Sequence, residues 1–223
     1  MQNTNWRIRR LCVMALLCAM AFAAVAVIRI PVVVFLKYEP KDVLLVIGGF
    51  LFGPLAGGLM ATAVALLELV TVSDTGIIGC VMNILSSCLF VCTAAAVYRR
   101  KRTLNAAVIG LVLGALATTA AMLLWNYLVT PLYMGIPRQA VTEMLLPVFL
   151  PFNLLKTALN SVLALLLYKT TVKALRASRL LPPTQASGGK PSRVVWVISL
   201  FILLTLVVLW ASPVRTLPRA LRI

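Results

Sequence analysis

The sequence predicts an all-α membrane protein, and three observations lead to this class. Of the 223 residues, 62% are hydrophobic and only 12% are charged. The apolar residues form runs long enough to cross a bilayer, which takes about 20 residues of helix. The 21 Lys and Arg residues outnumber the 5 Asp and Glu residues, and they stand in short clusters between the apolar runs. This pattern is the topology signal of a multi-pass protein and argues against a nucleic-acid-binding domain.

Apolar runs separated by Pro, Gly and charged residues predict the membrane segments. The first is expected to remain as an uncleaved span, because its apolar stretch continues past Ala23 to Ile28. The second is too short to cross alone, and Gly53-Pro54 separates it from the third, so we expect a broken hairpin that protein has to bury. The seven predicted segments are residues 11–29, 43–53, 54–72, 76–98, 105–130, 149–172 and 194–212.

The last predicted segment stands apart from the other six. Residues 180–193, rich in Pro, Gly and Ser, predict a linker on the cytoplasmic side between a membrane domain of residues 1–179 and a hydrophobic segment with a basic tail at 194–223. A crossing by residues 194–212 carries the tail arginines to the outer side, against the charge rule, so an interfacial or bent segment is the alternative.

Basic clusters orient the predicted spans. One precedes the first span (residues 7–10), one follows the fourth (99–102) and one follows the sixth (169–179). An even number of crossings separates these clusters, so all share one side, which the positive-inside rule predicts to be cytoplasmic together with the N-terminus. The acidic residues then fall at or towards the outer side: Glu39, Asp42, Glu68, Asp74 and Glu143.

Polar and aromatic residues gather at the outer ends of the spans. Asn153 and Lys156 lie three positions apart, hence on one helical face, and an ionisable group within a membrane span indicates a functional site. This mixture suits a flat heterocycle with polar edges better than a bare ion. The residues predicted to line one concavity are Lys37, Tyr38, Glu39, Asp42, Asn83, Asn126, Tyr127, Phe152, Asn153 and Lys156.

Structural roles are open for the same residues. Tyr127 also suits an interfacial anchor, and Lys156 a side chain that snorkels to the outer headgroups. Asn83 and Asn126 also suit hydrogen bonds between neighbouring helices. Residues 37–42 also fit a solvated loop. The five cysteines form no C-x-x-C pair and suit small buried hydrophobes, and no metal or cofactor is predicted.

Small residues recur at four-residue spacing, which lets another helix approach closely. The first span carries such a stripe at Ala15, Ala19 and Ala23. Packing within the chain and docking onto a separate membrane protein are both open for this stripe. The glycines at the same spacing favour internal packing: Gly49, Gly53 and Gly57 in the broken hairpin, and Gly110 and Gly114 in the fifth span.

Two longer stretches carry a resemblance to a known family. They are residues 36–42, Leu-Lys-Tyr-Glu-Pro-Lys-Asp, running into 47–57, and residues 73–76 through Met82-Asn83. Both resemble the substrate-binding S components of energy-coupling factor (ECF) vitamin transporters. Residues 151–156, Pro-Phe-Asn-Leu-Leu-Lys, resemble more narrowly the riboflavin-binding S component. The resemblance covers residues 11 to about 178 and leaves residues 194–223 without a counterpart.

The resemblance implies a six-helix S component that binds riboflavin in an outward-opening pocket of the bacterial plasma membrane. It implies docking, through Ala15, Ala19 and Ala23, onto a transmembrane T component that bears two ATPases. It also implies that Asn126, Asn153 and Lys156 meet the polar edge of the flavin, while residues 37–42 close over it. The chain itself is then a transport subunit and not an enzyme, and flavin mononucleotide (FMN) remains open as a second ligand.

Three other functions are open on sequence grounds. One is an S component for a different vitamin or small heterocycle, since the scaffold is shared. Another is an intramembrane enzyme, although such catalysis generally uses a His, a metal or paired acids, and the spans offer only Glu68. The third is a helical scaffold without a ligand.

Overall fold

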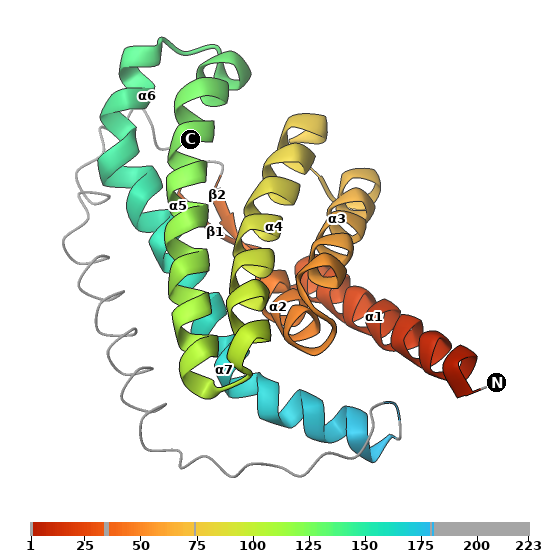
Figure 1. Ribbon diagram of the computed structural model, residues 1–223. Coiled ribbons are helices and arrows are strands. Elements are labelled where there is room, and N and C mark those ends of the chain that lie inside the picture. The colour runs from red at the N-terminus through yellow and green to blue at the C-terminus, as the bar shows by residue number, and fades with distance from the viewer. Residues whose placement is uncertain (1, 34–35, 74, 179, 181–223) are drawn as a thin grey trace.

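A computed structural model describes residues 2–33, 36–73, 75–178 and 180. The predicted segment 194–212 and most of the predicted linker lie outside the described residues. Five helices in the described part are long and apolar enough to cross a membrane. Together with a short buried helix they form the predicted all-α bundle (Figure 1).

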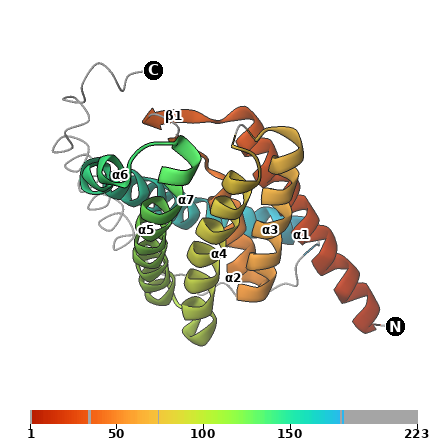
Figure 2. The ribbon, with the colours of Figure 1, turned by 90° about the horizontal axis from the view of Figure 1, so that it is seen from above.

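Helix α1, Gln2–Val27, packs through one stripe of residues. Val13, Leu17, Ala21 and Val25 are at most 1% exposed, and their four-residue spacing places them on one helical face. This stripe contacts α2 and α3. The N-terminal half of α1 extends away from the other helices in both views (Figures 1 and 2). Most of the surface of α1 therefore remains uncovered by the described residues.

A two-stranded antiparallel hairpin follows α1, where the sequence predicted a loop. Strand β1, Ile30–Val33, pairs with β2, Leu36–Tyr38, with Ile30 opposite Tyr38 and an irregular register between Pro31 and Val33. The β-branched residues of β1 favour an extended backbone. The hairpin fixes the position of Lys37 and of the residues that enter α2.

Helices α2, Lys41–Phe52, and α3, Pro54–Thr71, form the predicted broken hairpin. Gly53 joins them with a φ of 96°, a conformation open to glycine because it has no Cβ. Pro54 then begins α3, where its missing N–H is not needed. Helix α2 contacts α1, α3, α4 and α7 and is buried along most of its length. This burial confirms that protein encloses the short helix.

Helices α4, Gly76–Lys101, and α5, Leu104–Met134, pack closely along their length. A Cβ added at Gly110 would lie 2.6 Å from the Ala94 carbonyl oxygen, and one at Gly114 would lie 2.8 Å from the Phe90 carbonyl oxygen. A Cβ at Gly57 would lie 3.1 Å from the Gly49 Cα. Internal packing is therefore confirmed for these four glycines, whereas Gly53 serves the turn.

The last predicted span has a longer approach than the sequence indicated. Helix α6, Arg138–Met144, and a π-helical turn, Leu145–Phe149, precede α7, Leu150–Ala177. The Leu150 N–H donates to the Leu145 carbonyl oxygen, five residues back. Pro147 and Pro151 in this stretch lack the N–H of a regular helical bond, which favours the wider turn. The turn leads directly into Phe152, Asn153 and Lys156.

The bundle has two chemically different ends. At one end lie the α2–α3 turn and the α4–α5 connection, and Arg10 of α1 reaches the Phe52 carbonyl oxygen there. Tyr98 of α4 and Tyr168 of α7 also meet at this end, with their hydroxyl oxygens 3.2 Å apart. We call it the basic end because the predicted basic clusters of residues 7–10 and 99–102 and Lys169 lie there. The opposite end holds the β-hairpin and the α3–α4 and α5–α6 connections.

Candidate ligand-binding pocket

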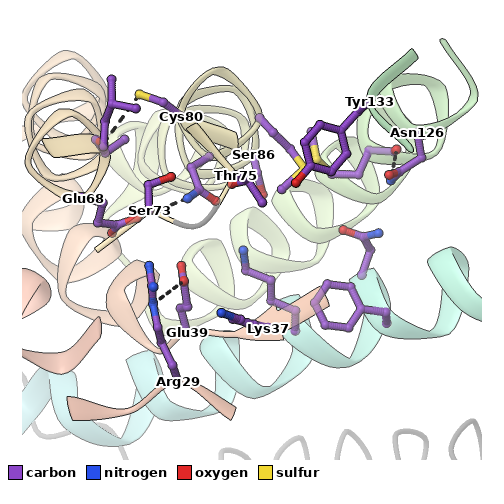
Figure 3. Close-up of a pocket in the computed structure, with 18 residues that line it drawn as sticks. Arg29, Lys37, Glu39, Glu68, Ser73, Thr75, Cys80, Ser86, Asn126 and Tyr133 are labelled. Atoms are coloured by element: carbon purple, nitrogen blue, oxygen red, sulfur yellow. Dashed lines mark hydrogen bonds and ion pairs between the residues drawn. The ribbon is translucent and has the colours of Figure 1, made fainter. Parts of the chain in front are cut away.

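A pocket of about 300 Å³ lies at the end opposite the basic end, among the β-hairpin, α3, α4, α5 and α7. Small-molecule pockets begin at about this size. Figure 3 shows Asn126 and Tyr133 towards one end of the pocket and Glu68 and Ser73 towards the other, with Lys37 between them. Seven of the ten predicted site residues line it: Lys37, Glu39, Asn83, Asn126, Phe152, Asn153 and Lys156.

The first two turns of α7 supply one wall of the pocket. Asn153 is 5% exposed, and its Nδ2 donates to the Phe149 carbonyl oxygen at 2.8 Å. A carboxamide has two N–H donors and an accepting oxygen, so this bond orients the group and leaves capacity for a ligand. Lys156 lies one turn further along, beside Phe152 on the same wall. The wall thus combines an aromatic ring, an amide and an ammonium group.

Lys156 does not snorkel to the headgroup layer. Its side chain is 9% exposed, and its Nζ lies 3.9 Å from Asp42 Oδ2. At this distance the ion pair is loose, because a charge-assisted N–H···O bond is about 2.7–2.9 Å long. Asp42 therefore keeps the ammonium group near the pocket, and its N–H donors remain available to a ligand.

The two asparagines of α4 and α5 are positioned differently. Asn126 donates to the Met122 carbonyl oxygen at 2.7 Å and accepts from Thr130 Oγ1 at 2.9 Å, so its bonds stay within α5. Asn83 donates to Glu68 Oε2 at 3.1 Å and therefore links α4 to α3. The interhelical role is found for Asn83 only, and both residues still line the pocket.

A buried ionic cluster forms the floor beside Glu39 and Glu68. Lys41 is 1% exposed, and its Nζ lies 2.6 and 2.8 Å from the two carboxylate oxygens of Glu68 and 3.0 Å from Glu39 Oε2. Arg29 Nε lies 3.2 Å from Glu39 Oε1, and Arg29 also donates to the Val72 carbonyl oxygen. The cluster thereby ties the segments on both sides of the β-hairpin to α3.

Residues 39–42 are therefore not a solvated loop, because Glu39, Lys41 and Asp42 are each at most 6% exposed. Burial by itself raises the pKa of Glu39, but the nearby Lys41, Lys156 and Arg29 outweigh it and hold that pKa below its usual value. Glu39 accordingly remains a carboxylate that can accept hydrogen bonds at neutral pH.

Tyr38 and Asp42, both predicted to line the concavity, lie behind it and brace it. Asp42 accepts from Ser87 Oγ at 2.6 Å and from Asn160 Nδ2 at 3.3 Å. Tyr38 donates from its hydroxyl to Asn160 Oδ1 at 3.0 Å. Burial, reinforced by the Asp42 charge, raises the pKa of Tyr38 to about 12, so it stays a donor. Asn160, fully buried on α7, was not predicted.

Tyr127 also lies outside the set that lines the pocket. Its ring lies 5.4 Å from the Arg138 guanidinium carbon, a cation–π contact that joins α5 to α6. Tyr133, two turns further along α5, contributes to the lining instead. Sequence reasoning also missed Arg29, Ser73, Thr75 and Ser86. One signal was available in the sequence. A carboxylate in an apolar helix, such as Glu68, is rarely buried without an ionic or hydrogen-bonding partner, so such a partner was to be expected.

The alanine stripe of α1 faces away from the described bundle. Ala15, Ala19 and Ala23 are exposed, whereas the neighbouring Leu17 and Ala21 are buried. Packing within the described residues is thus not the role of this stripe. The face remains open to lipid or to another protein.

The chain matches the family model described as "ECF transporter, substrate-specific component" over residues 9–168. It is 29% identical over 178 residues to the riboflavin transporter RibU of Staphylococcus aureus, an alignment that covers 75% of this chain and 93% of that protein. It is also similar to the solved structure of the S component of a bacterial ECF transporter, with a TM-score of 0.64 and 28% identity. That similarity covers 79% of this chain and 99% of the other.

Proposed function

Because the chain belongs to the ECF transporter family of substrate-specific components, we propose that its pocket binds riboflavin for import across the bacterial plasma membrane. Similarity to a riboflavin transporter along 93% of that protein supports this ligand. The observation that carries the proposal is the wall of Phe152, Asn153 and Lys156, which presents an aromatic face and polar groups together.

The chemistry of the flavin suits this pocket. The isoalloxazine ring system is flat, and one edge displays carbonyl oxygens and ring nitrogens. Asn126 and Asn153 offer amide donors and acceptors to such an edge, and Lys156 offers an ammonium donor. Phe152 and Tyr133 offer aromatic surface to the rings. A ligand that lacks the matching polar edge would leave these buried groups unpaired, which favours selectivity.

Charge favours riboflavin over FMN. The cations Arg29, Lys37 and Lys156 at the pocket stand against the carboxylates Glu39 and Glu68, and Lys41 and Asp42 add one charge of each sign beside them. The named groups leave one net positive charge. A phosphate adds about −1.5 to −2 charges near pH 7, so this site would neutralise only part of it, and the rest would be buried at a cost in desolvation. We therefore expect uncharged riboflavin to bind more tightly than FMN.

We further propose that the chain supplies binding while partners supply energy. The exposed stripe of Ala15, Ala19 and Ala23 supports close docking of another membrane helix, and the family implies a T component with two ATPases as that partner. The gathering of basic clusters at one end supports a cytoplasmic location for that end and for the N-terminus. The pocket then faces outward.

Titration of the detergent-purified full chain with riboflavin, followed by quenching of flavin fluorescence, tests the ligand. Saturable quenching at a 1:1 stoichiometry is the expected result. FMN, which is fluorescent itself, is titrated separately in the same way, and non-fluorescent vitamins are tested as competitors of bound riboflavin. If a folded sample leaves flavin fluorescence unchanged, the riboflavin assignment is wrong and an S component for another heterocycle takes its place.

A further inference from the structure

A second cavity, of about 280 Å³, lies at the basic end of the bundle. Its walls come from three segments that are distant in sequence: Arg10 on α1, the α2–α3 turn, and the end of α4. Three arginines line it, Arg10, Arg99 and Arg102, together with Phe50, Phe52 and Leu55 among others. No residue of this cavity belongs to the proposed riboflavin pocket.

Arg10 contacts the α2–α3 turn directly, and Arg99 and Arg102 line the cavity beside it. Arg10 donates from Nη2 to the Phe52 carbonyl oxygen at 3.4 Å, and its guanidinium carbon lies 5.7 Å from the centroid of the Phe52 ring. A Cβ added at Gly53 would lie 3.9 Å from Arg99 Nη1. Arg102 caps α4 in a left-handed conformation, with a φ of 48°. Three exposed arginines from two helices thus line one cavity beside the α2–α3 turn.

Helix ends of both polarities meet at this cavity. The C-termini of α2 and α4 place partial negative charge beside the arginines, and the N-terminus of α3 places partial positive charge there. Helix α3 begins at Pro54, inside the cavity wall. The first N–H groups of a helix have no carbonyl partner within the helix, and the helix dipole places partial positive charge there. The N-terminus of an 18-residue helix and three guanidinium groups therefore converge on the same small volume.

No carboxylate side chain among the described residues lines this cavity. The chain has only 5 acidic residues. Glu39, Asp42 and Glu68 are paired or hydrogen-bonded around the riboflavin pocket, at the other end of the bundle. Glu143 lies on α6 at that other end, and Asp74 falls in the sequence between α3 and α4. The three arginines are exposed, and an anion from outside the chain can therefore bind them without competition from these carboxylates.

Apolar surface beside the cavity favours an anion with an attached hydrocarbon chain. Leu55 lines the cavity and is 81% exposed, and Leu59, one turn along α3, is 67% exposed. Leu11, next to Arg10, is 63% exposed. All three belong to helices apolar enough to span a membrane. The charged cavity therefore opens beside apolar surface, as expected where an amphiphile is bound.

We infer that this cavity binds the phosphate of an anionic phospholipid, whose acyl chains lie along Leu11, Leu55 and Leu59. Arginine forks pair with phosphate through parallel hydrogen bonds, and basic pockets between membrane helices are suited to anionic headgroups. The bound lipid would join α1, the α2–α3 turn and α4, and so stabilise the basic end. This inference does not depend on what the other pocket binds.

Short-chain lipids test the inference on the full chain in a non-ionic detergent. Dihexanoyl phosphatidylglycerol is titrated while the melting temperature is followed, and native mass spectrometry counts retained lipids. Dihexanoyl phosphatidylcholine and inorganic phosphate form separate arms. We expect one phosphatidylglycerol to be retained with a raised melting temperature, and neither of the other two compounds to match it.

Two matched variants locate the site. Arg99→Gln removes a lining guanidinium and should weaken phosphatidylglycerol binding about tenfold, as for loss of one charge-assisted contact. Arg100→Gln removes the same charge from the adjacent position, which does not line the cavity, and should leave binding unchanged. Arg10→Gln repeats the test from another helix in case Arg99→Gln does not fold. Far-UV circular dichroism and the elution profile on size exclusion serve as the check of folding.

Several results would overturn the inference. Equal losses in Arg99→Gln and Arg100→Gln would mean diffuse surface charge. Equal protection by inorganic phosphate would mean a site for soluble anions. Failure of the wild type to respond to phosphatidylglycerol, with capture of the coupling proteins weakened in Arg99→Gln, would mean that the cavity contacts a protein partner.

Discussion

Lys41 occupies the first position of α2, is 1% exposed and contacts carboxylates from two other segments. Removing such charges from water is costly, and only good geometry with further hydrogen bonds offsets the cost. Here Glu68 receives Lys41 at 2.6 Å and also accepts from Asn83, while Glu39 pairs with Arg29 as well. The ammonium therefore holds the end of the β-hairpin and α3 in one arrangement.

Lys41→Met should lower the free energy of unfolding by about 3–5 kcal/mol, because it leaves Glu39 and Glu68 buried without their shared cation. Thermal or denaturant unfolding in detergent measures the change. The double variant Lys41→Met/Glu68→Gln should recover part of the loss, since it removes one of the stranded charges. Wild-type stability of the single variant would show that the two acids do not need this lysine.

Asn153→Ala and Lys156→Ala should each weaken riboflavin binding by about 1–3 kcal/mol, because a polar group of the flavin edge is left without its partner. The quenching titration measures the affinity. Lys169→Ala removes the same charge from the exposed part of α7 and serves as the control. A folded Lys156→Ala protein with wild-type affinity would contradict the assignment of that wall to the flavin.

Helix α1 has one face that packs against the bundle and another that is exposed. The stripe through Val13, Leu17, Ala21 and Val25 is buried against α2 and α3, while the alanine stripe is exposed. Ala19→Leu should therefore spare riboflavin binding and reduce uptake severely in cells that supply the coupling proteins. Labelled riboflavin uptake and the quenching titration measure the two effects.

Met20→Leu, at an exposed position of α1 next to the stripe, should leave both uptake and binding unchanged. Undiminished transport by Ala19→Leu would mean that the alanine stripe has no docking role. Loss of riboflavin binding in Ala19→Leu would instead mean that this change in α1 disturbs the fold of the pocket.

Helices α4 and α5 approach closely enough for a methyl group to matter. The Cβ of Gly110→Ala would meet the backbone of Ala94, at 2.6 Å from its oxygen and 3.2 Å from its Cα. Because backbone cannot rotate away as a side chain can, this variant should lose about 1–3 kcal/mol of stability despite the better helix propensity of alanine. Thermal unfolding measures it, with Ile109→Ala at an exposed position as control. An unchanged melting temperature would mean that the two helices separate at little cost.

The bundle is polarised from end to end, with the paired carboxylates at one end and the arginine cavity at the other. Every residue that lines the proposed riboflavin pocket falls between Arg29 and Lys156, and the family match ends at residue 168. A chain that stops at residue 180 should therefore bind riboflavin as tightly as the full chain, as measured by quenching. A folded truncated chain with weakened binding would show that residues 181–223 contribute to the pocket.

Much of this arrangement was predictable, because the membrane helices follow from the order of apolar and polar segments along the sequence. The apolar runs indicated the helices, Gly53-Pro54 indicated the break between α2 and α3, and the parity of the crossings indicated that the basic clusters share one end. Asn153 and Lys156 were identifiable since polar groups are costly in an apolar segment. The prolines at positions 147 and 151 were visible too, but their effect, a π-helical turn after a short helix, was not.

The sequence by itself thus determined the all-α membrane class, the order of the helices and which residues are too polar to face lipid. Only the tertiary structure decided which of those residues meet. Lys41 and Glu68 lie 27 positions apart and Tyr38 and Asn160 lie 122 apart, and Tyr127, predicted to line the pocket, contacts Arg138 instead. The physical reason is that the tendency to be buried is a property of each side chain. Which side chains form a contact depends instead on how the helices are rotated and packed against one another.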